Sequence, residues 1–371
     1  MQSYVAQSER QQLTTERLGL TDPAEGPHAI QILVGDAVNV LADAWGLEVR
    51  WCRGPRIVPI EDNYDHLGIG SEAVSRDARY TRYVDESRVL RSHSSAMIPP
   101  ALRQLAAAPA DDVLLVCPGV VYRRDAIDWQ HTGTPHQLDL WRISRSPKLS
   151  GPDLEEMVDR LAGAVAPGRL YRCEDRVHPY TLEGRQVDVA HRQGWVEVWE
   201  CGLAHPEVLS RAGLDGWSGL ALGMGLDRLL MLRKGMPDIR LLRSVDSRIA
   251  SQMSDLGPYQ PVSSMPAIRR DLSIAVDRHD DSEDLGDRVR DALGTEAEAV
   301  EEVVVVSRTP YGDIPEPGRR RLGIQPTQDN LLVRIVLRHL ERTLTDQEAN
   351  GLRDRIYAAL HHGSVHQWAN Q

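Results

Sequence analysis

The spacing of apolar residues changes along the chain, and each change marks an expected element. Apolar residues at helical spacing predict a helix over 27–45, and the run LEVRW that follows predicts a strand. Two apolar stretches between 113 and 141 flank the polar segment IDWQHTGTP, which predicts a long antiparallel hairpin. Further strands are expected at QVDVA and GWVEVWECG. WSGLALGMG should lead into the helix LDRLLMLRK, which Gly235 and Pro237 would end.

The pattern becomes mixed over 241–264, where Gly257-Pro258 and Ser263-Ser264 occur, and a domain boundary is expected there. We therefore expect a polar lead over 1–28, a large domain over 29–245, a linker over 246–264 and a second domain over 265–371. Strand, helix, strand, a loop over 309–323, strand and helix follow in the second domain. That order is typical of a ferredoxin-like sandwich.

Composition narrows the class of protein. The chain has 371 residues and a net charge of −11, which does not indicate nucleic-acid binding by itself. No apolar run has the length of a membrane span, and the first residues lack a signal-peptide core, so a cytoplasmic protein without membrane partners is expected. The four cysteines are scattered, which favours reduced thiols over zinc or a disulfide framework. The chain contains no phenylalanine.

Polar residues in the expected hairpin could form a ligand site. In a strand through VYRRD, Arg123 and Asp125 would share one face, and in HQLD Gln137 and Asp139 would share one. An arginine, two carboxylates and an amide suit a ligand that carries phosphate and ammonium groups. The alternative is a solvated sheet face with incidental ion pairs.

A second candidate is the glycine-rich segment at 219–228. Its glycines allow close backbone approach, and Arg228 falls in the first turn of the following helix, near the positive end that favours phosphate. A strand packed tightly against a helix explains the same glycines.

Several segments resemble a known family. GLALGMGLDRLLMLRKGMPDIRLL resembles motif 3 of the phenylalanyl-tRNA synthetase catalytic subunit, VYRRDAIDWQHTGTPHQLD its motif 2, and GLEVRWCRGPRIVPIEDNYDHL its motif 1 region. LRSHSSAM and WVEVWECGLAHPEVL resemble two further segments of that family. MPAIRRDLSIAVD with ERTLTDQEA resembles its ferredoxin-fold anticodon-binding domain. The resemblance covers about residues 27–370.

The resemblance implies an α+β fold: a class II synthetase antiparallel sheet with flanking helices, plus a C-terminal ferredoxin-like α/β sandwich. The catalytic domain would be 29–245 and the anticodon-binding domain 265–371. The single-chain arrangement resembles the mitochondrial form, which implies a monomer. Its expected partners are ATP, Mg²⁺, tRNA and an amino acid, with phenylalanine tRNA as the expected tRNA.

The resemblance also implies roles for individual residues. Arg123 would hold the α-phosphate and Arg228 the distal phosphates, with help from His131. Asp125 would contact the adenine end, and Glu197 would be a magnesium ligand.

The amino-acid site and the tRNA site follow in the same way. The amino and carboxyl groups of the substrate would be held by His93, Ser95, Gln137 and Asp139. The pocket wall, Phe-Ala-Phe in the family, would be Leu220, Ala221 and Leu222. The expected tRNA contact is Arg319, Arg320 and Arg321.

The chain departs from the family in ways that leave three hypotheses open. Positions that hold phenylalanine in relatives, such as Tyr64 and Tyr180, hold other residues throughout the chain, which favours a backup phenylalanine-tRNA ligase made when charged phenylalanine tRNA is scarce. Ile98 and the shortened carboxylate of Asp139 are not explained by that avoidance. They leave room for a paralogue that activates a different aromatic or apolar amino acid, for tRNA or for a biosynthetic pathway. A non-catalytic tRNA-binding regulator is the third hypothesis, which Arg123, Gln137 and Arg228 disfavour.

Overall fold

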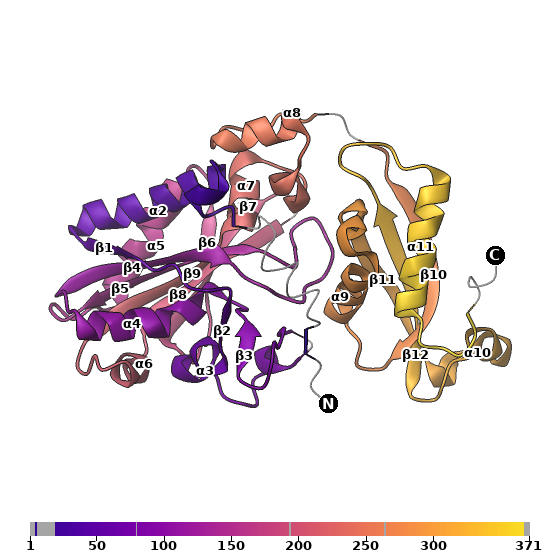
Figure 1. Ribbon diagram of the computed structural model, residues 1–371, viewed down its shortest axis with the longest axis horizontal. Coiled ribbons are helices and arrows are strands. Elements are labelled where there is room, and N and C mark those ends of the chain that lie inside the picture. The colour runs from indigo at the N-terminus through magenta and orange to yellow at the C-terminus, as the bar shows by residue number, and fades with distance from the viewer. Residues whose placement is uncertain (1–3, 6–18, 79, 193, 263–264, 367–371) are drawn as a thin grey trace. The chain divides into compact units, whose positions relative to one another are not determined.

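The computed structural model describes residues 4–5, 19–78, 80–192, 194–262 and 265–366. The chain divides into two compact units, the first of residues 1–123, 134–236 and 251–259 and the second of 124–133, 237–250 and 260–371 (Figure 1). Segments 124–133 and 237–250 thus group with the C-terminal residues, although the sequence pattern assigns 124–133 and 237–245 to the first expected domain and 246–250 to the linker.

The first unit is built on a seven-stranded sheet with the strand order β1-β4-β5-β9-β8-β7-β6. The β1–β4 pair is parallel, and the other neighbouring pairs are antiparallel. The strands are β1 (Glu48–Trp51), β4 (Asp112–Val120), β5 (His136–Ser144), β6 (Tyr171–Asp175), β7 (Thr181–His191), β8 (Gly194–Ala204) and β9 (Ser218–Gly225).

Helices cover both faces of this sheet (Figure 1). One face carries α2 (Ala29–Trp45), α5 (Gly151–Val165) and α7 (Leu226–Lys234). The other face carries α4 (Ile98–Ala107) and α6 (Pro206–Arg211). Beside them, β2 (Ile57–Pro59) pairs with β3 (Arg88–Leu90), and α3 (Ile60–Asn63) follows β2.

Local chemistry explains where these helices begin and end. Ser150 and Asp153 form a capping box at the start of α5, which satisfies backbone N–H groups that have no partner inside the helix. Gly46 and Gly235 end α2 and α7 at φ 63° and 68°, a backbone region that glycine enters without steric cost.

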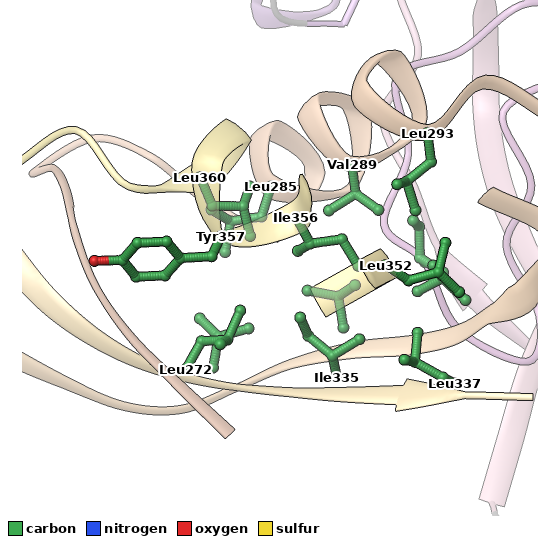
Figure 2. Packing of buried hydrophobic residues seen from close by; sticks show 14 of the residues in the cluster. Leu272, Leu285, Val289, Leu293, Ile335, Leu337, Leu352, Ile356, Tyr357 and Leu360 are labelled. Carbon is green, nitrogen blue, oxygen red and sulfur yellow. The ribbon is translucent and has the colours of Figure 1, made fainter. Parts of the chain in front are cut away.

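The second unit has the expected order of elements. Its three-stranded antiparallel sheet has the order β10-β12-β11, and its two longer helices pack on it through a buried apolar cluster (Figure 2). The elements are β10 (Ile268–Asp277), α9 (Ser282–Leu293), β11 (Val300–Pro310), β12 (Gln328–Leu337) and α11 (Asp346–Leu360), with short α8 (Ser247–Ala250) and α10 (Glu316–Leu322). A fourth strand of a full ferredoxin-like sandwich does not occur among the residues described.

Two expectations about local structure are wrong. The segment 309–323 contains α10, because Pro317 fits the first turn of a helix and Gly323, at φ 60°, ends it. The strand through VYRRD ends at Val120, so Arg123 and Asp125 do not alternate along a strand. The helices α4 and α5, both amphipathic, were not expected from the sequence pattern.

Candidate functional site

Four neighbouring strands bring functional side chains to one face of the large sheet. Asp139 on β5 pairs with Cys117 on β4 and with Gly223 on β9, and Gly223 pairs in turn with Glu200 on β8. Directly paired residues of a sheet point to the same side. Two carboxylates therefore share the face that α4 and α6 cover, with a glycine between them.

Asp139 is the buried centre of this face. Its carboxylate accepts hydrogen bonds from the Ser94 hydroxyl and from Nε1 of Trp141 at 3.1 Å. Burial raises the pKa of Asp139 to about 6, although hydrogen bonds from Ser94, Ser95 and Trp141 oppose that rise. An ammonium group would therefore meet a carboxylate that ionises near neutral pH and that no described cation already neutralises.

The segment before α4 supplies the other predicted amino-acid contacts. The N–H of Ser94 donates to Oε1 of Gln137 at 3.1 Å, so the segment is tied to β5. Both ring nitrogens of His93 are shielded from water and make no hydrogen bond of normal geometry to the described residues. Burial, and then the charge of Arg123, lower the pKa of His93 to about 4, so its ring is neutral at physiological pH.

Basic and acidic residues meet near the middle of β8. The Arg228 guanidinium donates to the backbone oxygen of Glu197 at 2.9 Å, and Arg123 is close enough to act on both Glu197 and Glu200. Partial desolvation, and then the charge of Glu200, raise the pKa of Glu197. Desolvation would also raise the pKa of Glu200, but the neighbouring His178 and Arg176 outweigh it, so the pKa of Glu200 is lowered.

A buried contact positions Arg228. Asp227, the residue before it in α7, accepts the backbone N–H of His136, and its other oxygen lies 3.2 Å from Nδ1 of the same residue. Both side chains are buried, at 0% and 2% exposure, so the first turn of α7 is fixed to the start of β5. Arg228 consequently lies in the helix turn where the dipole favours anions.

These charges suit a magnesium nucleotide. Mg²⁺ in phosphate-binding sites is held by one or two carboxylates together with phosphate oxygens. Glu197 and Glu200 could supply the carboxylates, and Arg123 and Arg228 could neutralise the phosphates. Among the described residues, the group of three side chains that could by themselves hold a metal is Asp277, Asp280 and His362, in the second unit.

The other two predicted nucleotide contacts lie in the second unit. Asp125 and His131 are in segment 124–133, where the backbone oxygen of Asp125 accepts from Arg290. Nδ1 of His131 lies 2.6 Å from Oδ2 of Asp128. Ile127 between them is buried in the apolar cluster of α9, α11 and the three-stranded sheet. The first unit therefore contains Arg123 and Arg228 but not Asp125 or His131.

The predicted pocket wall on β9 is wrong for two of its three residues. Leu222 pairs with Leu140 and Leu220 pairs with Arg142, which is the opposite parity from Asp139. The Arg142 guanidinium lies 4.4 Å from the Trp45 ring of α2. The sheet face that carries Arg142, Leu220 and Leu222 is therefore the face that α2 covers. Leu220 and Leu222 are consequently core residues on the far side of the sheet, and Ala221 alone of the three shares the face of Asp139.

An aromatic group that sequence reasoning missed lies just before β7, which begins at Thr181. The Tyr180 ring stacks with Trp141 and with His178, at centroid distances of 6.4 Å and 5.4 Å. Nε2 of His178 lies 3.1 Å from Oε2 of Glu200. Tyr180 also interacts electrostatically with Asp139 and Arg123. The signal in the sequence was Tyr180, one of the positions where the family resemblance implies a phenylalanine.

The predicted tRNA contact lies on α10. Arg319 stacks 4.4 Å over Tyr311 and donates to the Gly312 oxygen at 2.8 Å, so it is largely committed to the second unit itself. Arg320 is exposed and lies 3.6 Å from Glu316, and Arg321 is exposed. Two of the three arginines therefore present their charge to solvent.

No helix in the described part of the chain is long and apolar enough to cross a membrane.

Comparison with known proteins agrees with this geometry. The family described as "tRNA synthetases class II core domain (F)" matches residues 36–253. A probable mitochondrial phenylalanine-tRNA ligase of Drosophila melanogaster is 29% identical over 82% of this chain and 75% of its own. The chloroplastic/mitochondrial phenylalanine-tRNA ligase of Arabidopsis thaliana is 29% identical over 81% of this chain and 68% of its own.

A bacterial subunit matches a smaller part of the chain at higher identity. The phenylalanine-tRNA ligase alpha subunit of Prochlorococcus marinus (strain MIT 9313) is 33% identical over 65% of this chain and 71% of its own. The family match spans more than half of the chain and includes the strands and the helix that carry Asp139, Glu197 and Arg228. The chain belongs to the class II aminoacyl-tRNA synthetases, as a phenylalanyl-tRNA synthetase.

Proposed function

We propose that the sheet face around Asp139 is where this phenylalanine-tRNA ligase activates its amino acid. The observation that carries the proposal is a buried carboxylate on the same sheet face as Glu200, whose surroundings include Arg123. Asp139 and Gln137 would bind the ammonium group of the amino acid. His93 and Ser95 would border its carboxylate, and the neutral ring of His93 would add no charge there.

Activation needs the amino-acid carboxylate to attack the α-phosphate of ATP while pyrophosphate leaves. Arg123 would hold the α-phosphate, and Arg228, fixed by the contact of Asp227 with β5, would hold the distal phosphates. Mg²⁺ bound to Glu197 and Glu200 would neutralise further charge on those phosphates. Positioning and charge neutralisation are the main sources of rate in phosphoryl transfer.

Amino-acid-dependent pyrophosphate exchange tests this assignment directly. Exchange should be measured for each of the twenty amino acids and for ring-substituted phenylalanines, with phenylalanine expected to give the highest kcat/KM among the natural ones. Exchange with another amino acid far above phenylalanine would instead support a paralogue with a changed substrate. No exchange with any amino acid would support the non-catalytic regulator.

The aromatic wall gives the changed-substrate hypothesis one specific observation. His178, which stacks with the Tyr180 ring, forms a polar pair with Glu200, and Ile98 packs in the same apolar cluster as Trp141. A phenylalanine with a polar ring substituent would meet hydrogen-bonding groups at this wall. We therefore expect ring-substituted analogues to be accepted beside phenylalanine.

We further propose that the chain is a backup enzyme whose own synthesis does not consume phenylalanyl-tRNA. The chain has no phenylalanine but ten tyrosines and eight tryptophans, so aromatic residues are not avoided in general. The avoidance reaches buried positions that have no proposed role in binding, such as Leu242 and Met253, and a pocket adaptation would not require those changes. We also expect a monomer, for which sedimentation equilibrium of the purified chain is the test.

A further inference from the structure

Two of the four cysteines lie side by side in the first unit. The parallel pair β1–β4 aligns Trp51 with Val116, and the N–H of Cys52 continues that ladder by donating to the Val116 oxygen at 2.8 Å. Cys52 and Cys117 are consequently the next residues in register. Paired positions of neighbouring strands point their side chains to the same face, so the two thiols project together.

The spacing of the two strands is compatible with a disulfide. Neighbouring strands lie about 4.8 Å apart, and disulfides join Cα atoms that are roughly 4.4–6.8 Å apart. Cys117 is the largest influence on the pKa of the Cys52 thiol, and both side chains pack in the apolar cluster that includes Trp141. The Cys52 thiol itself donates to the Arg50 backbone oxygen at 3.5 Å.

The two thiols differ in the way that an attacking and a resolving cysteine differ. Cys52 is half-buried, and the hydrogen bond from Cys117 lowers the pKa of the Cys52 thiol. Cys117 is fully buried, and burial raises the pKa of its thiol. The reachable sulfur is therefore the one that more readily forms a thiolate, which is the reactive form.

The pair adjoins the proposed amino-acid site. Cys117 is the register partner of Asp139, so its side chain lies next to the buried carboxylate on the same face. Arg91 covers Gly119, the next residue on that face of β4, and donates to the Val120 oxygen at 2.8 Å. A bond that pulls the Cys117 sulfur toward Cys52 would alter the packing beneath Asp139.

We propose that Cys52 and Cys117 form a reversible disulfide when a peroxide oxidises the protein, and that this bond suppresses amino-acid activation. The Cys52 thiolate attacks one peroxide oxygen, the O–O bond breaks, and the departing hydroxide takes a proton to become water. The Cys117 sulfur then attacks the Cys52 sulfenic acid, the S–O bond breaks, and the hydroxide leaves with the Cys117 proton as a second water. Two thiols and one hydrogen peroxide thus give one disulfide and two waters.

The test uses the full-length chain treated with hydrogen peroxide and then with an alkylating reagent. Peptide mapping detects the disulfide whether or not the enzyme is active, and pyrophosphate exchange measures its effect; only the second readout rests on the proposed function. Cys52→Ser removes the attacking thiol at a half-buried position. Cys173→Ser, on the exposed edge strand β6, is the matched control.

We expect a Cys52–Cys117 peptide in the oxidised wild type and in Cys173→Ser, with exchange reduced by roughly tenfold or more, as when a reacting group is slightly misplaced. Dithiothreitol should restore the rate, and Cys52→Ser should keep its exchange activity through the same treatment. Absence of the linked peptide would overturn the proposal. So would a linked peptide without loss of exchange, or equal loss in Cys52→Ser. A reduced protein without any exchange would instead count against the proposed function, with the peptide result still decisive for the disulfide.

Discussion

At the scale of single residues, Asp139 combines a functional requirement with a cost in stability. Its side chain is 2% exposed and receives hydrogen bonds from Ser94 and Trp141, but no cation lies against it among the described contacts. Burial without a cation favours the protonated acid, which is why its pKa is raised to about 6. The ammonium group of a bound amino acid would supply the missing charge.

Asp139→Asn should therefore abolish activation of phenylalanine yet stabilise the ligand-free protein above pH 6. The folded pKa of about 6 exceeds the unfolded value, so the folded state binds the extra proton and loses stability as pH rises through the window from about 4 to 6. A pKa shift of about two units corresponds to roughly 3 kcal/mol of unfolding free energy, which the wild type loses over this pH range. The Asp139→Asn variant has no titrating group at this position and would keep that stability.

Urea denaturation at pH 4, 6 and 8 measures the difference, with Asp111→Asn at an exposed site as the control. The advantage of the asparagine variant over the wild type should grow from pH 4 to pH 6 and then level off. A constant difference across that range would show that Asp139 does not titrate there.

Arg123→Ala and Arg228→Ala test the phosphate assignment. Each substitution removes a charge that would stabilise the transferring phosphate, so each should slow pyrophosphate exchange by roughly 10²–10³-fold. Arg160→Ala, an exposed arginine of α5 paired with Glu156, controls for the loss of a surface charge. Near-normal exchange in either site variant, with circular dichroism unchanged, would refute the assignment.

At the scale of elements, strand β9 was expected to line the amino-acid site, but its Leu220 and Leu222 face α2. The aromatic residues just before β7 are instead the proposed wall of that site. Leu222→Phe should cost about 1–3 kcal/mol of unfolding free energy through overpacking, with little change in amino-acid preference, because Leu222 faces α2 rather than Asp139. Tyr180→Leu should instead raise the KM for phenylalanine about two- to tenfold, since each aromatic contact contributes roughly 0.5–1.5 kcal/mol beyond burial. Measuring both the KM and the urea midpoint of each variant separates these effects. A shift of preference in Leu222→Phe would contradict the register argument.

The second unit affects what a tRNA experiment can show. Removing the residues after about 262 would uncover Ile127 and the segment that carries Asp125 and His131, so such a deletion would disturb more than tRNA binding. The double variant Arg320→Ala/Arg321→Ala on α10 is cleaner, because both side chains are exposed.

We expect that double variant to keep normal pyrophosphate exchange but to charge tRNA with a higher KM. The slope of log binding constant against log salt should become shallower by about 0.7–0.9 for each tRNA phosphate that the variant no longer neutralises. Arg334→Ala, whose guanidinium is paired with Asp271 at 2.8 Å, is a matched arginine control on the same unit. An unchanged salt dependence would show that α10 does not bind the tRNA.

At the scale of the whole molecule, the absence of phenylalanine makes a prediction about synthesis. When charged phenylalanine tRNA is depleted in cells, production of the wild-type chain should continue better than that of a Tyr4→Phe/Tyr171→Phe variant, because each phenylalanine codon would stall translation. Both tyrosines are exposed, at 46% and 36%, so the folded protein should tolerate the substitutions, although Tyr171→Phe removes the hydrogen bond that the Tyr171 hydroxyl donates to Asp159. Quantitative immunoblotting of the two chains during phenylalanine starvation is the measurement. Equal production would remove the support for a backup role.

The sequence by itself determined the family and many of the elements, though not α4, α5 or α10, because both depend on local or linear patterns. Helical spacing located α2, α9 and α11, the polar segment between two apolar runs located the β4–β5 hairpin, and ordered motifs identified the synthetase. Residues whose neighbours are close in sequence, such as Arg228 in the first turn of α7, were also placed correctly.

Only the tertiary structure decided which side chains share a face. Strand register sends Leu220 and Leu222 to the helix α2 side and leaves Ala221 beside Asp139, and a shift of one residue would reverse that outcome. Register across a parallel pair likewise brings together Cys52 and Cys117, which are far apart in sequence. Tyr180 reaches Trp141 for the same reason: contacts between strands depend on how the strands align, and no linear pattern encodes that alignment.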